Sequence, residues 1–393
     1  MSQAAQRRLR IGVLGLGRAF TVMLPTFARD PRIALVAAAD PRADARARFA
    51  QEFSSRVYDN AEALCSDPEV DVVYIATPHQ YHASQALLAA KNGKHLLVEK
   101  PMALTLDDCL ALTEAARSAG VQLVVGHSHS FDAPIARARE LIQSGEFGAV
   151  RMITAFNYTD YLYRLRRPEE LDSAAGGGAI WNQAAHQVDI VRLIGGGLVK
   201  SVHAASGAWD RARPTEGAYG ALLRFENGCF ATLSYSGYGN FDSDEFQNWI
   251  GEMGRPKRPN SARKVQPFLR PAEEAAAKNA RNYGGPDYQL ATDAPVAHQH
   301  FGTIVVSCDG ADLRPVPNGV VIYKNGERRL DELVPPIIPR REVVDELTAA
   351  VISGQKPLHD GQWAAATLEV CLAMLESSHT GREVALKHQV ASA

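Results

Sequence analysis

A lysine directly after an apolar, strand-like run is the first residue that suggests chemistry. The stretch 95–104, HLLVEKPMAL, carries Lys100 between Glu99 and Pro101. Ligands of parallel sheets bind outside the carboxyl ends of the strands, so an ammonium group at this place would face a substrate while the adjacent carboxylate holds or tunes it. Lys100 is therefore a candidate for the reacting site.

Two glycines, Gly15 and Gly17, stand between another apolar run and a segment with helical spacing, and Phe20 takes the place of a third glycine. Glycines there permit a tight turn and the close approach of a pyrophosphate, whose charge a helix N-terminus stabilises. Asp40 ends the next apolar run, 23 residues after Gly17, where a carboxylate would accept hydrogen bonds from the adenosine ribose. The pattern predicts NAD. Arg42 keeps NADP open because it could pair with a 2′-phosphate, and a purely structural role for Asp40 as a helix cap is the other alternative.

Histidines recur at alternate positions in two places. His127 and His129 share one strand-like run, and His298 and His300 lie in an irregular segment. Paired imidazoles at this spacing can bind a metal, but no nearby carboxylate or cysteine set accompanies them in the pattern, so we predict no metal site. His129, past the end of its strand, is better suited to contact a substrate.

The elements that must position these residues begin with five short apolar runs. They are 10–15, 34–40, 70–77, 94–100 and 121–127. Near-continuous apolar runs separated by helical stretches indicate a parallel sheet covered on both faces. The sequence therefore predicts an α/β fold whose first domain, 1–130, is a doubly wound Rossmann domain that binds NAD(P).

The pattern changes after residue 131. Runs at 149–158, 217–237 and 319–330 alternate apolar and polar residues, and Asn227-Gly228 inside the second run is a strong hairpin signal. We expect 131–393 to form an α+β domain with a large, mostly antiparallel open sheet, used for substrate binding and oligomerisation.

Residues 251–300 have little periodicity and are rich in proline, arginine, lysine and asparagine. Charged runs of this kind usually face water, so an irregular, solvated insertion is the first expectation. A lid over the site is the alternative.

Composition limits the class of partner. With 393 residues and 46% hydrophobic content the chain is long enough for two domains. Its 42 basic and 44 acidic side chains give no net field for nucleic acid or an anionic membrane, which favours a small molecule. Five scattered cysteines without a Cys-x-x-Cys pair, a polar N-terminus and the lack of an apolar run near 18 residues predict a cytoplasmic protein.

Four stretches carry a resemblance that spans nearly the whole chain. GLGRAF, ATPHQYH, VEKPMAL and GGGAIWNQAAHQVDIVRLIGG resemble the glucose–fructose oxidoreductase, inositol dehydrogenase and MocA family. The resemblance implies an NAD(P)-dependent dehydrogenase in which Lys100 contacts the reacting hydroxyl and the bond from Lys100 to Pro101 is commonly cis. It also implies a homodimer or homotetramer built through the outer face of the C-terminal sheet. The implied cofactor-binding residues are Gly15, Gly17, Arg18, Ala19, Phe20, Asp40, Thr77, Pro78, His82, Glu99 and Lys100.

Members of this family carry an aspartate and a histidine four residues apart, after a run of glycines. The matching positions here are Asn182 and His186. Asparagine cannot take a proton or hold an anionic contact, which leaves His186 or Lys100 as the base and puts a standard polyol substrate in doubt.

Three further stretches, VVGHSHSFDAP, NYTDYLYRLRRPEELD and GAWDRARPTEGAY, resemble the 4,5-dihydroxyphthalate dehydrogenase branch of the family. That branch oxidises a cis-dihydrodiol that carries two carboxylates. Aromatic and arginine side chains suit a flat ring bearing anions, because guanidinium groups bind carboxylates bidentately. The candidate substrate-binding residues are His129, Tyr158, Arg164, Trp181, Asn182 and His186.

Two other functions remain open at this stage. A dehydrogenase of a sugar, inositol or other polyol would share the fold and Lys100. A non-catalytic NAD-binding sensor is kept open by the missing aspartate, although an intact Lys100 and His186 argue against it.

Overall fold

The computed structural model describes residues 8–259, 269–290 and 294–392. Contacts between residues divide the chain into two units. The first unit takes the described residues of Met1–His127, Ala275–Asp293 and Ile338–Ala365. The second takes those of Ser128–Glu274, Ala294–Ile337 and Ala366–Ala393. The first unit therefore contains two later segments besides the N-terminal one.

Six parallel strands form the sheet of the first unit, in the order β3-β2-β1-β4-β5-β6. The strands are β1 (Leu9–Leu14), β2 (Ile33–Ala39), β3 (Arg56–Tyr58), β4 (Val72–Ile75), β5 (His95–Val98) and β6 (Leu123–Val125). The helices between them are α1 (Arg18–Arg29), α2 (Ala43–Phe53), α3 (Ala61–Cys65), α4 (His82–Lys91) and α5 (Leu106–Ser118). Strand order reverses between β1 and β4, and the loops at such a switch point form the ligand crevice of doubly wound sheets.

All five predicted strands are present in this sheet, and the predicted doubly wound fold is confirmed. β3 went unpredicted because its three residues are exposed or only partly buried and form no apolar run. Thr105 caps α5 by accepting a hydrogen bond from the backbone N–H of Asp108 at 3.1 Å.

The segment 251–300 departs from the irregular insertion that its composition suggested. Its middle contains α8 (Pro271–Ala280), and Tyr283 just beyond is fully buried within the first unit. The ring of Tyr283 lies 5.2 Å from that of Phe20, edge to face. Aromatic burial rather than apolar periodicity holds this part in place, which is why the pattern missed it. The stretches 260–268 and 291–293 lie outside the described residues.

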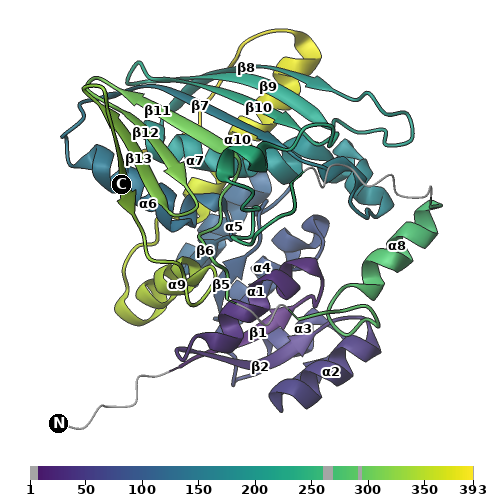
Figure 1. Cartoon of the computed structure of the whole chain (residues 1–393). Helices are drawn as coiled ribbons and strands as arrows, with labels where there is room; N and C mark the ends of the chain where they lie inside the picture. Colours follow the sequence, from purple (N-terminus) through teal and green to yellow (C-terminus); the bar gives the residue numbers. More distant parts are fainter. Residues whose placement is uncertain (1–7, 260–268, 291–293, 393) are drawn as a thin grey trace, which may run out of the picture. The chain divides into compact units, whose positions relative to one another are not determined.

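A nine-stranded sheet forms the second unit, in the order β14-β13-β12-β11-β7-β10-β9-β8-β15 (Figure 1). The strands are β7 (Val150–Tyr158), β8 (Val199–Gly207), β9 (Ala218–Phe225), β10 (Phe230–Ser236), β11 (Thr303–Cys308), β12 (Asp312–Val316), β13 (Gly319–Lys324), β14 (Glu327–Glu332) and β15 (Val384–Ala385). Every neighbouring pair is antiparallel except β7 with β10. The predicted large, mostly antiparallel sheet is confirmed.

The hairpin expected at Asn227-Gly228 joins β9 to β10, with Gly228 at φ +85°. That left-handed conformation suits glycine, since it has no Cβ to clash. The helices of the remaining chain are α6 (Ala133–Gln143), α7 (Ala185–Gly195), α9 (Arg341–Ser353) and α10 (Gly361–Thr380). Among the described helices, none combines the length and the apolar character needed to cross a membrane.

One buried face of the large sheet carries α7. This helix packs against β7 and β10, and each of its residues is buried. A single π-helical turn, Ile180–Ala184, leads directly into it. Turns of this kind are rare and often occur at functional sites.

Candidate active site

The loop after β1 fits a dinucleotide. Gly15 has φ +90°, and a Cβ there would lie 2.9 Å from the carbonyl oxygen of Ala76, so only glycine is accommodated. A Cβ on Gly17 would meet no atom within 4 Å, which leaves open space in front of the first turn of α1. No side chain caps that turn. Backbone N–H groups at an uncapped N-terminus suit a pyrophosphate.

The other residues predicted in this loop differ in exposure. Arg18 is exposed and Ala19 is partly buried, whereas Phe20 is fully buried. The ring centroid of Phe20 lies 5.9 Å from that of Phe49 of α2, so this side chain anchors the glycine loop to the core of the first unit.

The carboxylate of Asp40 ties the glycine loop to the end of β2. Its Oδ2 accepts a hydrogen bond from the backbone N–H of Leu16 at 2.7 Å, and its Oδ1 accepts from the backbone N–H and the Nε of Arg42 at 2.9 and 3.1 Å. A carboxylate offers about four lone-pair directions, so these three bonds use most of them. Asp40 therefore holds both the loop and Arg42 while keeping capacity for a ribose hydroxyl.

His82 links the loop after β4 to the loop after β5. Its Nδ1 lies 2.8 Å from the carbonyl oxygen of Pro101, and its Nε2 lies 2.8 Å from that of Thr77. The ring is fully buried, and burial lowers its pKa. Thr77 also donates from its hydroxyl to Gln85 at 2.7 Å, and Pro78 precedes the short turn that leads to His82. We interpret His82 as a residue that positions these loops.

The strand-end pair Glu99-Lys100 lies beyond β5. The peptide bond from Lys100 to Pro101 is cis, as the resemblance implied. Glu99 is buried and accepts a hydrogen bond from the hydroxyl of Tyr74 at 2.6 Å. Burial raises the pKa of Glu99, while the bond from Tyr74 and the charges of Arg340 and Lys100 oppose that rise. Glu99 thus interacts with Lys100 through charge and is itself fixed by Tyr74.

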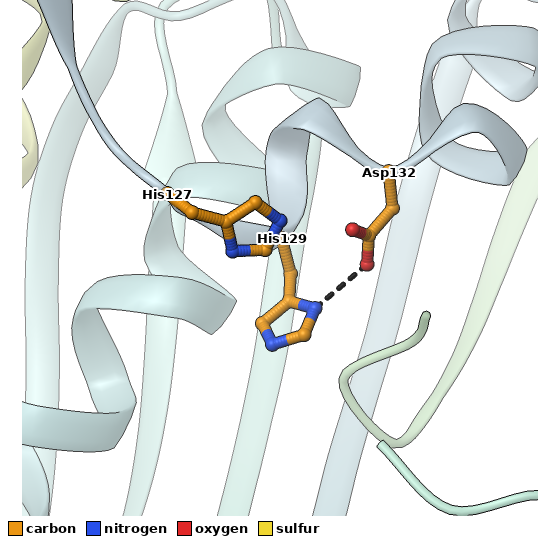
Figure 2. Close-up of side chains that lie close together, drawn as sticks. All are labelled: His127, His129 and Asp132. Atoms are coloured by element: carbon orange, nitrogen blue, oxygen red, sulfur yellow. Dashed lines mark hydrogen bonds and ion pairs between the residues drawn. The ribbon is translucent and has the colours of Figure 1, made fainter. Parts of the chain in front are cut away.

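In the second unit, His129 is a buried histidine that stands between two carboxylates. Its Nδ1 is hydrogen-bonded to Asp132 at 2.7 Å (Figure 2). Its Nε2 lies 3.4 Å from the carboxylate of Glu252. Burial lowers the pKa of His129, but both carboxylates outweigh burial and raise the pKa to about 9. His129 is therefore an imidazolium cation at neutral pH and cannot act as a general base there.

Glu252 also interacts with Arg164. The guanidinium of Arg164 lies 3.9 Å from Glu252 and 2.9 Å from Asp160. Burial raises the pKa of Glu252, but the hydrogen bond with His129 and the charge of Arg164 hold it well below its usual range. The result is an alternating chain of charges, with a carboxylate between two cations.

His186, the predicted base, lies beside this chain. Its ring centroid is 4.8 Å from that of His129 and 5.0 Å from that of Phe301. Phe301 in turn stacks on Tyr235 of β10, with an angle of 7° between the rings. We call Asp132, His129, Glu252, Arg164, His186, Phe301 and Tyr235 the histidine group. The structure thus brings three predicted residues, His129, Arg164 and His186, together in one place.

Two other predicted residues lie on the turn before α7. Asn182 donates from its amide to the carbonyl oxygen of Gly178 at 3.0 Å, and Trp181 donates from its indole to the carbonyl oxygen of Ser173 at 2.9 Å. Both side chains are thus anchored to backbone oxygens.

Tyr158, another predicted residue, lies apart from the histidine group. Alternate residues of a strand point to opposite faces, and Tyr235 pairs with Asn157, the neighbour of Tyr158. Tyr235 and Asn157 share the buried face that carries α7, whereas Tyr158 lies on the other face, with its ring 5.6 Å from that of Phe241. The register between β7 and β10, whose paired residues lie 78 positions apart (230 − 152), places Tyr235 and not Tyr158 on the face of the histidine group. A substrate contact for Tyr158 stays a prediction.

The sequence missed four members of the histidine group. Asp132 stands three residues after His129 and could have been found from that spacing. The alternation of Ala231, Leu233 and Tyr235 in β10 predicts an inward face and so could have indicated Tyr235. Glu252 and Phe301 lie outside regular elements and had no local signal.

Two histidines and an aspartate cluster just after β6, and the prediction of no metal site stays a prediction. His127, His129 and Asp132 offer ligand atoms that all lie within 4.8 Å of one another, a clustering that the histidine spacing alone did not reveal. Figure 2 shows that the Nδ1 of His129 faces Asp132, and their hydrogen bond occupies that nitrogen. The roles of Lys100 in the first unit and His186 in the second as alternative bases also stay predictions.

Comparisons with known proteins match both units. Residues 9–127 match the oxidoreductase family with an NAD-binding Rossmann fold, and residues 135–254 match the GFO/IDH/MocA C-terminal domain. The chain is 48% identical over 375 residues, 94% of each chain, to 1-carboxy-3-chloro-3,4-dihydroxycyclo hexa-1,5-diene dehydrogenase of Comamonas testosteroni. It is 26% identical to the myo-inositol 2-dehydrogenase of Thermotoga maritima over 63% of this chain and 74% of that protein.

A solved structure of a dehydrogenase from Bordetella bronchiseptica RB50 superposes with a TM-score of 0.91 at 41% identity, covering 96% of this chain and all of the other. The family resemblance, the NAD-binding domain and the enzymatic class are therefore confirmed. The protein belongs to the Gfo/Idh/MocA oxidoreductase family and is an NAD-dependent dehydrogenase that acts on CH–OH groups.

Proposed function

We propose that the protein oxidises a carboxylated cis-dihydrodiol to the corresponding catechol, with 4,5-dihydro-4,5-dihydroxyphthalate as its substrate. One carbinol carbon gives up a hydride to the nicotinamide ring of NAD, and the hydroxyl on that carbon gives up a proton to Lys100 or His186. The resulting hydroxydienone tautomerises to an aromatic ring, which favours the forward direction.

The observation that carries this proposal is the similarity to the Comamonas dehydrogenase along 94% of both chains. The name of that relative describes a ring with one carboxyl group, one chlorine and two adjacent hydroxyl groups. A myo-inositol dehydrogenase is similar over a smaller share of the chain and at lower identity. These two similarities together favour a ring diol with a carboxylate over a polyol as the substrate.

The charges of the histidine group support the same substrate class. His129 is a buried imidazolium, and Arg164 is a partly exposed guanidinium on the other side of Glu252. Cations held in fixed places select anionic ligands, and guanidinium binds carboxylates bidentately. All three neighbouring arginines have partners, but only Arg164 lies beside Glu252 of the histidine group, whereas Arg166 lies on the ring of Tyr161 at 3.8 Å and Arg167 is paired with Glu169 at 3.1 Å. We therefore assign carboxylate recognition to Arg164 and His129.

Asn182 fits a dicarboxylate better than an aspartate would. Its amide donates to the carbonyl oxygen of Gly178, a bond that an ionised carboxylate could not make. A neutral side chain four residues before His186 also adds no negative charge to a site meant for anions. The departure from the family pattern thus follows from the charge of the substrate.

A matched pair of arginine variants tests the proposal. Arg164→Met should lower kcat/KM for the phthalate diol about tenfold to a hundredfold, the worth of one or two charge-assisted hydrogen bonds, and should change an uncharged cis-dihydrodiol little. Arg151→Met serves as the control, because Arg151 is an exposed β7 residue paired with Asp309 at 2.6 Å. Equal losses of kcat/KM for charged and uncharged diols would show that Arg164 does not recognise a carboxylate. Faster turnover of inositol than of any diol would show that the protein is a polyol dehydrogenase.

We further propose that a second copy of the chain covers the exposed face of the nine-stranded sheet. Met152 and Phe230 are register partners on β7 and β10 and are both exposed. Phe246 and Phe241 are exposed too, with ring centroids 5.9 Å apart. Apolar side chains gathered on one sheet face mark protein contacts.

Light scattering should find a dimer or larger species in the parent and a smaller one for Phe230→Lys. An unchanged mass would contradict this interface.

A further inference from the structure

A strap from the middle of the chain fixes Arg42 in the first unit. The strap, residues 281–288, follows α8, and its Tyr283 is fully buried. The Nη1 of Arg42 donates to the carbonyl oxygen of Tyr283 at 3.1 Å, and the Nη2 donates to the carbonyl oxygen of Leu16 at 2.8 Å. The Nε donates to Asp40. Each nitrogen of this guanidinium is therefore engaged with a different partner.

The strap itself is held by three kinds of contact with α1 and α2. The hydroxyl of Tyr283 donates to Glu52 at 2.8 Å, and its ring meets that of Phe20 edge to face. The guanidinium of Arg48 lies over the rings of Tyr283 and Tyr288, at 5.4 and 4.7 Å from their centroids. The carbonyl oxygen that receives Arg42 is thus fixed from several sides.

Gly284 brings the strap against the backbone of α2. It has φ +80°, and a Cβ there would lie 2.5 Å from the Cα of Ala45. A contact below 3.0 Å with backbone atoms forces one side to move, so a side chain at this position would lift the strap away from the first turn of α2. Glycine is required by conformation and by space at once.

We propose that the strap is a determinant of NAD preference, because it holds Arg42 along the glycine loop and away from a ribose 2′-phosphate. An arginine after the second strand is the group that accommodates the 2′-phosphate of NADP in other Rossmann domains. Here the same residue type is present, but its nitrogens are bound to Asp40, Leu16 and Tyr283. NADP binding would require Arg42 to leave the strap and would also place a phosphate beside the carboxylate of Asp40. A segment more than 240 residues away in sequence thereby sets the cofactor choice.

Cofactor binding to three single variants tests the proposal without any substrate. Fluorescence titration with NADH and with NADPH gives the ratio of the two dissociation constants. Gly284→Ala should shift that ratio about tenfold toward NADPH, the worth of one charge-assisted hydrogen bond to the phosphate. Tyr283→Phe removes only the bond to Glu52 and should shift the ratio less in the same direction. Gly93→Ala is the control, since Gly93 lies in the same unit at φ +69° with no atom within 4 Å of its Cβ position.

The same variants in an Arg42→Ala background separate this role from a structural one. If the strap acts through Arg42, Gly284→Ala should leave the ratio unchanged once the guanidinium is gone. A Gly284→Ala enzyme that binds both cofactors more weakly at a constant ratio would overturn the proposal, because the strap would then only stabilise the unit. A shift in the ratio of the two dissociation constants that persists in the Arg42→Ala background would overturn the proposal as well.

Discussion

The glycine loop of the first unit and the histidine group of the second are built in opposite ways. The loop and its partners, Gly15, Gly17 and Asp40, each follow a strand within a few residues, so the sheet order alone places them. The histidine group draws its side chains from segments spread between residues 129 and 301, including an isolated turn at Glu252. The glycine loop therefore depends mainly on local order, with one distant strap behind Arg42, whereas the histidine group depends on the packing of distant segments throughout.

The largest expected effect on the reaction rate comes from Lys100, the residue that the sequence pattern indicates most clearly. Lys100→Met should reduce single-turnover hydride transfer by about 10³-fold or more, toward the upper range for loss of a positioned proton-transfer group. NADH affinity should stay nearly constant, because the pyrophosphate loop follows β1 whereas Lys100 follows β5. A Lys100→Met enzyme with near-parent rates would move the chemistry away from the β5 loop.

In the second unit, the corresponding substitution is His186→Asn. If His186 accepts the proton, the rate should fall by about 10² to 10⁴, the usual worth of a general base. The pH–rate profile then distinguishes the two candidates, because the variant loses the ionisation of the acceptor only if His186 is that acceptor. A profile that keeps its shape at a reduced rate would assign the proton to Lys100.

Much of the first unit could be predicted from its sequence, and the reason lies in the strands. β1, β4 and β5 are buried and nearly continuous in apolar residues, so each strand end was visible and the residues after it were found. The buried Tyr283 was not found, since one aromatic residue in a polar stretch has no period. In the second unit the strands and the hairpin were visible, but the cross-strand register that puts Tyr235 in place of Tyr158 depends on pairing and leaves no local trace.

Removing a cofactor contact should have a smaller effect than removing a catalytic group. Asp40→Ala should narrow the preference for NAD over NADP by about tenfold, since it removes one acceptor for the ribose and releases both Leu16 and Arg42. Steady-state kcat/KM for each cofactor with one diol provides the comparison. Better turnover with NADP than with NAD in the parent enzyme would defeat the assignment of Asp40.

The smallest expected effect is on stability, through His129. Its pKa in the folded chain is about 9, above the ordinary value near 6.5, so its protonation stabilises the fold fully below about pH 6.5. That contribution is lost as pH rises through 9. Asp132→Asn removes one of the two carboxylates that raise the pKa of His129. The free energy of unfolding of the variant should therefore depend less on pH than that of the parent. Urea unfolding at pH 6, 7.5 and 9.5 gives the free energies. Equal slopes in parent and variant would show that Asp132 does not raise the pKa of His129.

The account as a whole depends on the substrate, and product analysis of the parent enzyme tests it most directly. Purified protein with NAD and the cis-4,5-dihydrodiol of phthalate should form one NADH and one 4,5-dihydroxyphthalate for each diol consumed. Under the same conditions myo-inositol should give a kcat/KM lower by about 10² or more, because it would leave the cations that recognise a carboxylate without their anionic partner. NADH formation from inositol that matches or exceeds that from the phthalate diol would contradict the account.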